Sequence, residues 1–275
     1  MGYLNIPHRF GEPLPSQRNR VFRLKWGDAQ QELGDLLLPQ RIDIREALFD
    51  GIDGTISCVS TSAGIAPNTF IGQPLAIQFV TDRGTLHSVC GLVTDAYEGE
   101  SDRSLAVYQL VVRDALTVLE RRVNTRVFRK MSIPDIVGTL VSEWRRKSST
   151  LAGAFDIDLS KLDPDRYPIR EQTNQFAESD AHFIRRLCRR EGIGWFVRTG
   201  SATSADANGG SDTAHSLVLF DNAIKLAPCT AGTAVYRPGA TVGERDAITL
   251  LTAGCRLVPG STQSRSWDYK AGRVD

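Results

Sequence analysis

The 275-residue sequence lacks both a long apolar run and a marked excess of charge of either sign. No stretch approaches the roughly 20 apolar residues of a membrane-spanning helix, so we expect no membrane insertion by this chain. Its 33 basic and 32 acidic residues leave a net charge of +1, which gives no strong overall attraction to nucleic acid. The N-terminal residues contain no apolar signal-peptide core, and we therefore expect no cleaved secretion signal.

Cysteine is also scarce, and its positions show no regular spacing. The five residues are Cys58, Cys90, Cys188, Cys229 and Cys255. An odd number of scattered cysteines does not predict a disulfide framework. Reduced and mostly packed thiols, as in a cytoplasmic protein, are the simpler expectation.

The composition that remains, 41% hydrophobic and 24% charged, is that of a soluble globular protein, and the length predicts about two domains. Residues 1–18 are polar, contain three prolines and are expected to form a flexible tail. From Val21 to about Asp114, short apolar runs alternate with turn residues, including Asp82-Arg83-Gly84 between two runs. This pattern predicts an antiparallel sandwich or barrel.

The sequence from Ser132 to Lys147 has the pattern of an amphipathic helix. Ser132 is the candidate N-cap, Pro134 falls in the first turn, and Asp135 completes a start that resembles a capping box. Apolar residues then recur on one helical face at Ile136, Val137, Leu140, Val141 and Trp144.

The stretch FAESDAHFIRRLCRREGIGWFVR, residues 176–198, is interpreted as a turn, a second helix and a strand. Ser179 is the expected N-cap and Gly192 the residue that ends the helix. Residues 200–214 have a flexible composition and are expected to connect that strand to the next, HSLVLF, as a hairpin. Further strands are expected after Cys229, the last of them in CRLV at residues 255–258.

Two groups of residues resemble catalytic sets. Ser179, Asp180 and His182 include a nucleophile, an acid and a base, but close neighbours on a helix point in different directions, and no G-x-S-x-G elbow is present. Helix capping and surface polarity explain them better. An aspartate-rich segment could supply a glycosidase-like pair of carboxylates. A solvated loop or strand face is the favoured interpretation of that segment. That segment contains Asp156, Asp158, Asp163 and Asp165.

Metal, cofactor and nucleic-acid sites are not indicated. His87 with Cys90, and His182 with Cys188, lack the further ligands of a zinc site. The basic residues at 121–130 and 185–190 lack the interleaved aromatic residues or recognisable module of a nucleic-acid site. By these arguments alone the chain is a β-rich protein with a helical insertion and no visible active site.

The run from Tyr167 to Arg198 resembles the signature of VgrG proteins, the tip components of type VI secretion, although Phe176 stands where tyrosine is common. Neighbouring segments, including HSLVLFDN and RSWDYK, fit the same family in order, and the resemblance spans about Leu36 to Lys270. The positions that match the signature are Pro168, Arg170, Gln175, Phe176, Glu178, Ser179, Asp180, Phe183, Arg186, Leu187, Glu191, Gly192 and Ile193.

The resemblance implies an α+β, mainly antiparallel fold like a phage baseplate hub. It has two β-barrels, the second apparently incomplete, joined by a mixed α/β region. It divides the chain into a tail (1–18), a first barrel (19–114), a helical connecting region (115–192) and a truncated second barrel (193–275). In this family the helix and its glycine exit form a structural joint between the barrels.

The implied function is that of a non-enzymatic hub in a type VI secretion spike. The implied partners are two further copies in a homotrimer and the hexameric secretion tube. Effectors and a spike-capping protein would bind through the family's C-terminal domain and needle, which are absent from this sequence. The chain would assemble in the cytoplasm and leave through the secretion apparatus. A phage-tail or tail-like baseplate hub, and a hydrolase with an unrecognised active site, are the alternatives.

Overall fold

The structure is a computed structural model. It describes residues 17, 20–27, 33–81, 84, 86–101, 105–200 and 213–228, and parts of 233–274. The chain divides into two compact units, residues 1–228 and 229–275, which are described separately. Within the described residues, no helix combines the length and apolar character needed to cross a membrane.

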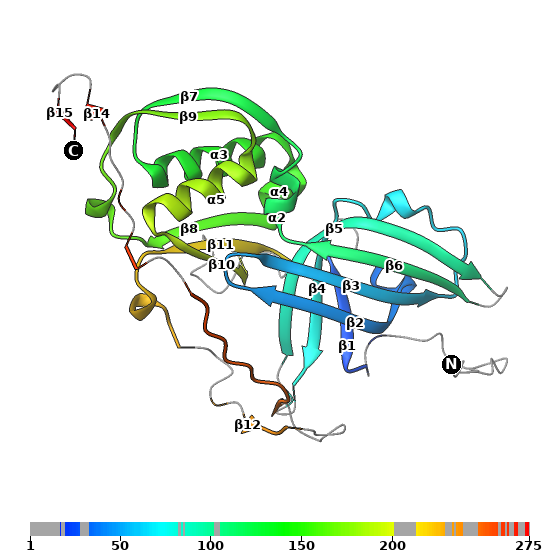
Figure 1. Cartoon of the computed structure of the whole chain (residues 1–275). Helices are drawn as coiled ribbons and strands as arrows, with labels where there is room; N and C mark the ends of the chain where they lie inside the picture. Colours follow the sequence, from blue (N-terminus) through cyan, green and yellow to red (C-terminus); the bar gives the residue numbers. More distant parts are fainter. Residues whose placement is uncertain are drawn as a thin grey trace, which may run out of the picture. The chain divides into compact units, whose positions relative to one another are not determined.

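The N-terminal part of the first unit is a six-stranded antiparallel sheet with the strand order β1-β4-β5-β6-β3-β2 (Figure 1). The strands are β1 (Phe22–Trp26), β2 (Leu38–Ala47), β3 (Gly51–Ser60), β4 (Pro74–Val80), β5 (Leu86–Ser101) and β6 (Ala106–Arg113), and helix α1 (Leu33–Leu36) precedes β2. The sheet curls until its edge strands β1 and β2 contact each other, and Arg20 Nη1 donates to the carbonyl oxygen of Pro39 at 3.2 Å. The antiparallel sheet predicted for this region is therefore confirmed.

Apolar side chains fill the inside of this curled sheet. Phe70 is fully buried, and its ring centroid lies 5.7 Å from that of Trp26 and 5.9 Å from that of Tyr108. The Tyr108 hydroxyl stays inside because it accepts a hydrogen bond from the Ile65 amide at 3.0 Å. Burial of these large side chains is the main stabilising contribution here, since each removes a large apolar area from water.

The second part of this unit has two long helices, α3 and α5, between strands. Its elements are α2 (Ala115–Leu119), β7 (Val123–Met131), α3 (Ile133–Lys147), α4 (Ser149–Ala154), β8 (Phe155–Lys161), β9 (Arg170–Ser179), α5 (Asp180–Glu191), β10 (Gly194–Thr199) and β11 (His215–Phe220). Figure 1 shows α3 and α5 between the β7–β9 ribbon and the three-stranded sheet β10-β11-β8. The predicted β10–β11 hairpin is confirmed, while β8 joins β11 in parallel.

Local capping explains why α3 and α5 begin, and why α5 ends, where the sequence predicts. Ser132 Oγ accepts from the Asp135 amide at 3.3 Å, and the Asp135 carboxylate accepts from the Ser132 amide at 3.2 Å. Ser179 Oγ accepts from the His182 amide at 3.2 Å. Gly192, with φ 68°, ends α5 in the left-handed conformation that glycine adopts without strain.

Buried hydrogen bonds hold the passage from the curled sheet into the helical part, at Asp114 and Ala115. The Asp114 carboxylate accepts from the Ile52 amide at 3.0 Å and from the Leu116 amide at 2.9 Å, which connects β3 to the start of α2. His215 Nε2 accepts from the Ala115 amide at 3.0 Å. The passage from the sheet into the helical part is thus held by hydrogen bonds from both sides.

The structure corrects some sequence predictions. Residues 176–179 are the end of strand β9 and not a turn, and β7 was not expected as a strand. In the second unit, residues 255–257 have no regular structure, so the strand predicted in CRLV is wrong for the described part. That unit contains two short pairs, β12 (Val235–Tyr236) with β13 (Ala247–Ile248), and β14 (Trp267–Asp268) with β15 (Arg273–Val274).

Several predicted segments fall outside the described residues. These are the turn residues 82 and 83, residues 201–212 of the predicted loop and all of the predicted tail except Gln17.

Candidate functional site

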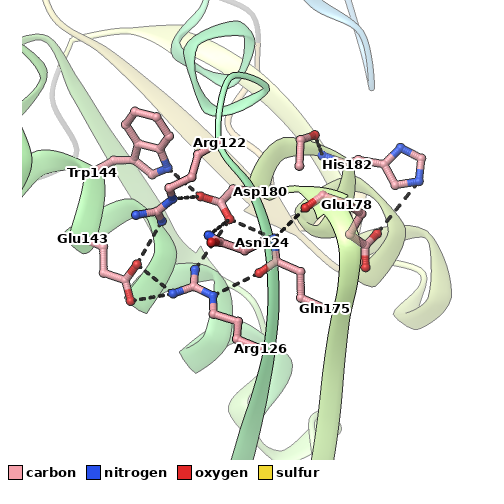
Figure 2. Close-up of polar contacts among 10 residues, drawn as sticks. Arg122, Asn124, Arg126, Glu143, Trp144, Gln175, Glu178, Asp180 and His182 are labelled. Atoms are coloured by element: carbon pink, nitrogen blue, oxygen red, sulfur yellow. Dashed lines mark hydrogen bonds and ion pairs between the residues drawn. The ribbon is translucent and has the colours of Figure 1, made fainter.

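The signature segment converges on Asp180, the first residue of α5. Its side chain has no exposed surface. Figure 2 shows the carboxylate at the centre of a polar cluster. Arg122 Nε lies 2.5 Å and Trp144 Nε1 2.8 Å from Asp180 Oδ2, and Gln175 Nε2 lies 2.9 Å from Oδ1. These donors come from the start of β7, from α3 and from β9, so one carboxylate joins three elements to α5.

A second carboxylate, that of Glu143 on α3, completes the cluster. It accepts from Arg122 Nη2 at 2.9 Å and from Arg126 Nη1 at 2.9 and 3.0 Å. Arg126 Nε also donates to the Gln175 side chain at 3.0 Å. We call Arg122, Arg126, Glu143, Gln175 and Asp180 the joint cluster. Two half-buried cations face two carboxylates, so opposite charges are paired within the cluster.

The electrostatics fit a permanently charged structural group. Burial by itself would raise the pKa of Asp180, but hydrogen bonds from Gln175, Trp144 and Arg122 and the Arg122 charge outweigh it, so this pKa is lowered. Asp180 therefore stays ionised at neutral pH. A carboxyl group held in this state, with its oxygens already occupied, is poorly suited to general acid or base catalysis.

Aromatic rings pack against both arginines of the joint cluster. The Arg122 guanidinium lies 4.9 Å from the Trp144 ring centroid, and that of Arg126 lies 4.9 Å from the Phe128 ring centroid. Phe128 in turn stacks on Phe183 of α5 at 5.6 Å. The polar cluster thus continues directly into the apolar core below the β7–β9 ribbon.

Two further pairs within the signature surround the cluster. Arg186 on α5 pairs with Glu178 of β9, with Nη2 2.5 Å from Oε1 and Nε 3.0 Å from Oε2. Arg170, at the start of β9, pairs with Glu191 in the last turn of α5. The charged residues of the signature therefore bind one another and hold the strand against the helix.

The other signature positions are divided between core and surface. Phe183, Leu187 and Ile193 are buried, Ser179 and Gly192 cap α5, and Pro168 and Phe176 are exposed. Phe176 has an exposed fraction of 77%, next to a bulge in the β7–β9 ladder where Ala177 has φ 47°.

Ser179, Asp180 and His182 do not form a catalytic triad. The Ser179 hydroxyl caps the helix, and the Asp180 carboxylate is held by Arg122 and Trp144. Figure 2 shows the His182 ring directed to Glu178, with Nε2 4.0 Å from its carboxylate. The capping role predicted for Ser179 is confirmed, but surface polarity is wrong for Asp180, because the Arg122 and Trp144 donors allow its burial.

The aspartate-rich segment also serves structural contacts. Asp156 is buried, contrary to the predicted solvated face, because Arg145 Nη1 donates to it at 2.9 Å. Asp158 accepts from Arg198 Nη2 at 3.1 Å, and Asp163 accepts from the Asp165 amide at 3.2 Å. No group of three or more His, Cys, Asp or Glu among the described residues is arranged to hold a metal ion.

Sequence reasoning missed the partners of Asp180. Arg122 and Arg126 were counted only as members of a basic cluster, and Glu143 and Trp144 only as parts of a helix. A signal was available in the spacing of β7, where Asn124, Arg126 and Phe128 alternate and share the inward face. The pattern was hidden because two of these three inward residues are polar.

Comparisons with known proteins agree with this geometry. The family model described as phage tail baseplate hub (GPD) matches residues 45–275. Two type VI secretion system spike proteins of Pseudomonas aeruginosa match most of the chain. VgrG4b is 27% identical over 241 residues, 85% of this chain and 27% of its own length. VgrG1b is 23% identical over 238 residues, 86% of this chain and 29% of its own length.

A solved structure shows the same fold. The Escherichia coli c3393 protein superposes with a TM-score of 0.60 at 20% identity, over 79% of this chain and 52% of its own. It is described as a component of the type VI secretion system with structural similarity to the T4 bacteriophage tail proteins gp27 and gp5. The chain spans under a third of the length of the two VgrG proteins and about half of c3393. The resemblance to the hub region of VgrG proteins is confirmed, and the chain belongs to the phage tail baseplate hub (GPD) family.

Proposed function

We propose that this chain is the hub of a type VI secretion spike and acts as a structural protein, without an active site of its own. The observation that carries the proposal is the joint cluster in a chain that belongs to the hub family. The charged residues of the signature are used to fix α5 between β9 and α3. A rigid joint of this kind suits a protein that transmits force and position.

The partners in the proposal follow from the resemblance to VgrG proteins. The chain forms a homotrimer, in weak equilibrium with the monomer, and docks on the hexameric tube protein. The division predicted from the sequence is retained as part of the proposal, with a first barrel at 19–114, a connecting region at 115–192 and the start of a second barrel at 193–275. Effectors and a spike-capping protein join through the C-terminal domain and needle of the family. Assembly takes place in the cytoplasm, and export uses the secretion apparatus.

A second candidate is a baseplate hub of a phage tail or tail-derived particle. It is favoured by the description of the matching family. The two candidates share the fold and the trimer and differ in the tube protein that the hub accepts.

The test is the mass of the purified chain by light scattering across a concentration series, followed by pull-down with tube proteins of both kinds. We expect a mass that rises toward three chains, and retention of the type VI tube protein. A strict monomer at high concentration contradicts the proposed assembly. Retention of only a phage tube protein selects the second candidate.

A further inference from the structure

The β2–β3 turn holds two large apolar side chains in solvent. Leu48 and Phe49 have exposed fractions of 60% and 57%. Phe49 has φ 65°, a conformation that bulky residues rarely adopt, and its amide is fixed by the carbonyl oxygen of Trp195 at 3.2 Å. Backbone strain of this kind is a reason to look for a function at the position.

Beside this turn lies a cavity of about 450 Å³. We call it the turn groove and define it by Phe49, Arg185, Arg189, Trp195 and Phe220. It combines aromatic walls with two guanidinium groups from α5, so its chemistry suits an acidic segment that also carries an apolar side chain.

The positive charge of the turn groove is only partly paired with carboxylates of the same chain. Arg185 pairs with Glu120 at 2.5 Å, whereas Arg189 is exposed and has no ion pair with any described carboxylate. Asp221 also lines the groove, but Lys225 Nζ lies 3.3 Å from it and the Asp163 amide 2.6 Å from it. A positive charge is therefore available to a ligand.

A surface of the opposite character lies on β5 and β6. It consists of Tyr97, Glu100 and Val107, and we call it the acidic end. Tyr97 and Val107 have exposed fractions of 55% and 40%, and Glu100 is exposed. Glu98 faces the other side of β5, where the Gly64 amide at 3.1 Å and the Tyr108 hydroxyl at 3.4 Å donate to it, while Glu100 leads toward the β5–β6 connection.

The ladder places the two surfaces at opposite ends of the six-stranded sheet. In the β3–β6 pairing, Asp53 opposes Arg113 at the end near the β2–β3 turn, and Ser60 opposes Ala106 at the other end. At about 3.4 Å per residue, these ends are roughly 24 Å apart. The acidic end of one chain is thus remote from its own turn groove and free to meet another copy.

We propose that the acidic end of one copy occupies the turn groove of the next copy. Glu100 meets Arg189, and Tyr97 packs against Phe49. The two surfaces differ, so the contact is head-to-tail, and such contacts form a ring when the rotation between copies closes. This inference rests on the trimer of the proposed function and assigns the surfaces that build it.

Charge reversal tests the pairing directly. Arg189→Glu and Glu100→Arg are each expected to weaken trimer formation at least about tenfold, because like charges then face each other. The double variant should recover to within about threefold of wild type. Arg190→Glu is the matched control, since Arg190 is exposed on the same helix but does not line the groove, and it should leave the trimer mass unchanged. Additive losses in the double variant overturn the contact.

Cross-linking provides a second readout that does not depend on charge. In a background with Cys229→Ser and Cys255→Ser, the pair Leu48→Cys and Tyr97→Cys on one chain should give covalent trimers on mild oxidation. Each single variant alone should give none, and a mixture of the two should give dimers. Covalent dimers from one single variant would instead indicate a contact between identical surfaces.

The outcomes separate this inference from the proposed function. A wild-type trimer that is insensitive to every charge reversal, and that gives no cross-link, keeps the function and refutes this contact. A strict monomer at all concentrations refutes both. If Arg189→Glu abolishes tube-protein binding while the trimer persists, the groove belongs to the tube protein and the contact between copies is refuted.

Discussion

The curled sheet and the helical part are stabilised in different ways. In the sheet the buried side chains are almost all apolar, and the described exceptions are Gln17 and Ser60. From residue 114 onward the described chain buries eight polar side chains: Asp114, Asp156, Thr173, Gln175, Asp180, Thr213, His215 and Ser216. The curled sheet relies on burial of apolar area, which is non-directional. The helical part adds directional polar contacts.

The difference indicates what each region has to achieve. An apolar core tolerates small shifts as long as its volume is filled. The joint cluster does not, because a donor that moves leaves a buried charge without a partner. The helical part therefore fixes the orientation of α5, and with it the strand β10 that follows.

The largest expected effect comes from apolar truncation, and it should be equal in the two regions. Phe183 in the helical part and Phe70 in the sheet are both fully buried. Phe183→Ala and Phe70→Ala should each lower the free energy of unfolding by ~3–5 kcal/mol. Arg190→Ala, an exposed control on the same helix as Phe183, should cost under about 0.5 kcal/mol. Urea denaturation measures all three, and a loss at Phe183 as small as at Arg190 would show that the core of the helical part has been misassigned.

The second effect should distinguish the two regions. Asp180→Asn removes a buried charge that Arg122 and Trp144 contact, and it should cost about 3 kcal/mol because the half-buried Arg122 loses one of its two carboxylate partners. Asp53→Asn in the sheet is the matched control. Its exposed carboxylate lies 3.2 Å from Arg113 Nε, and exposed pairs contribute under about 1 kcal/mol. Equal and small losses would mean that the joint cluster does not fix α5.

The same contrast explains how much of the fold was predictable. The sheet strands and both long helices followed from apolar periodicity and from Ser132, Ser179 and Gly192, because these signals are local. Strands β7 and β9 were missed because polar groups such as Arg126 and Gln175 face inward, while Val127 and Phe176 face solvent. That arrangement reverses the alternation from which strands are recognised.

The partners of the candidate site could not be inferred for a related reason. Arg122 and Asp180 are 58 positions apart, and nothing local to either residue indicates the other. The strand pairing that brings them together depends on the folded ribbon. The family resemblance identified Asp180 as a signature position, but only the structure shows that it is buried and what it binds.

The third effect should appear on acidification, and it originates from a buried histidine in the helical part. His215 is completely buried, and burial lowers its pKa to about 4 from 6.5. The folded state therefore binds fewer protons than the unfolded state between these values, so stability falls as the pH falls through this window. Between pH 7 and pH 5 the loss from this group should be ~2 kcal/mol.

The comparison with His215→Gln isolates this contribution. Burial raises the pKa of the neighbouring Asp114, which acts in the opposite direction, but Asp114 is common to both proteins. The Gln side-chain oxygen can still accept from the Ala115 amide, so the variant should fold. Unfolding free energies of both proteins at pH 7 and pH 5 give the difference. Parallel pH profiles would show that His215 is not kept neutral by burial.

The smallest effect concerns how α5 ends. Gly192 has φ 68°, and a Cβ there would meet no atom within 4 Å, so Gly192→Ala tests backbone conformation without a steric clash. We expect a loss of ~1 kcal/mol, because an alanine in this region is strained. Gly153 in α4 is the control, since a Cβ there also meets nothing within 4 Å and its φ is ordinary. Gly153→Ala should be neutral or stabilise by up to about 1 kcal/mol, because alanine is the better helix former. Thermal unfolding of both variants measures the contrast. Similar changes in unfolding temperature for the two variants would mean that the backbone after α5 adjusts to alanine without strain. The joint cluster would then fix the helix but not the direction in which β10 leaves it.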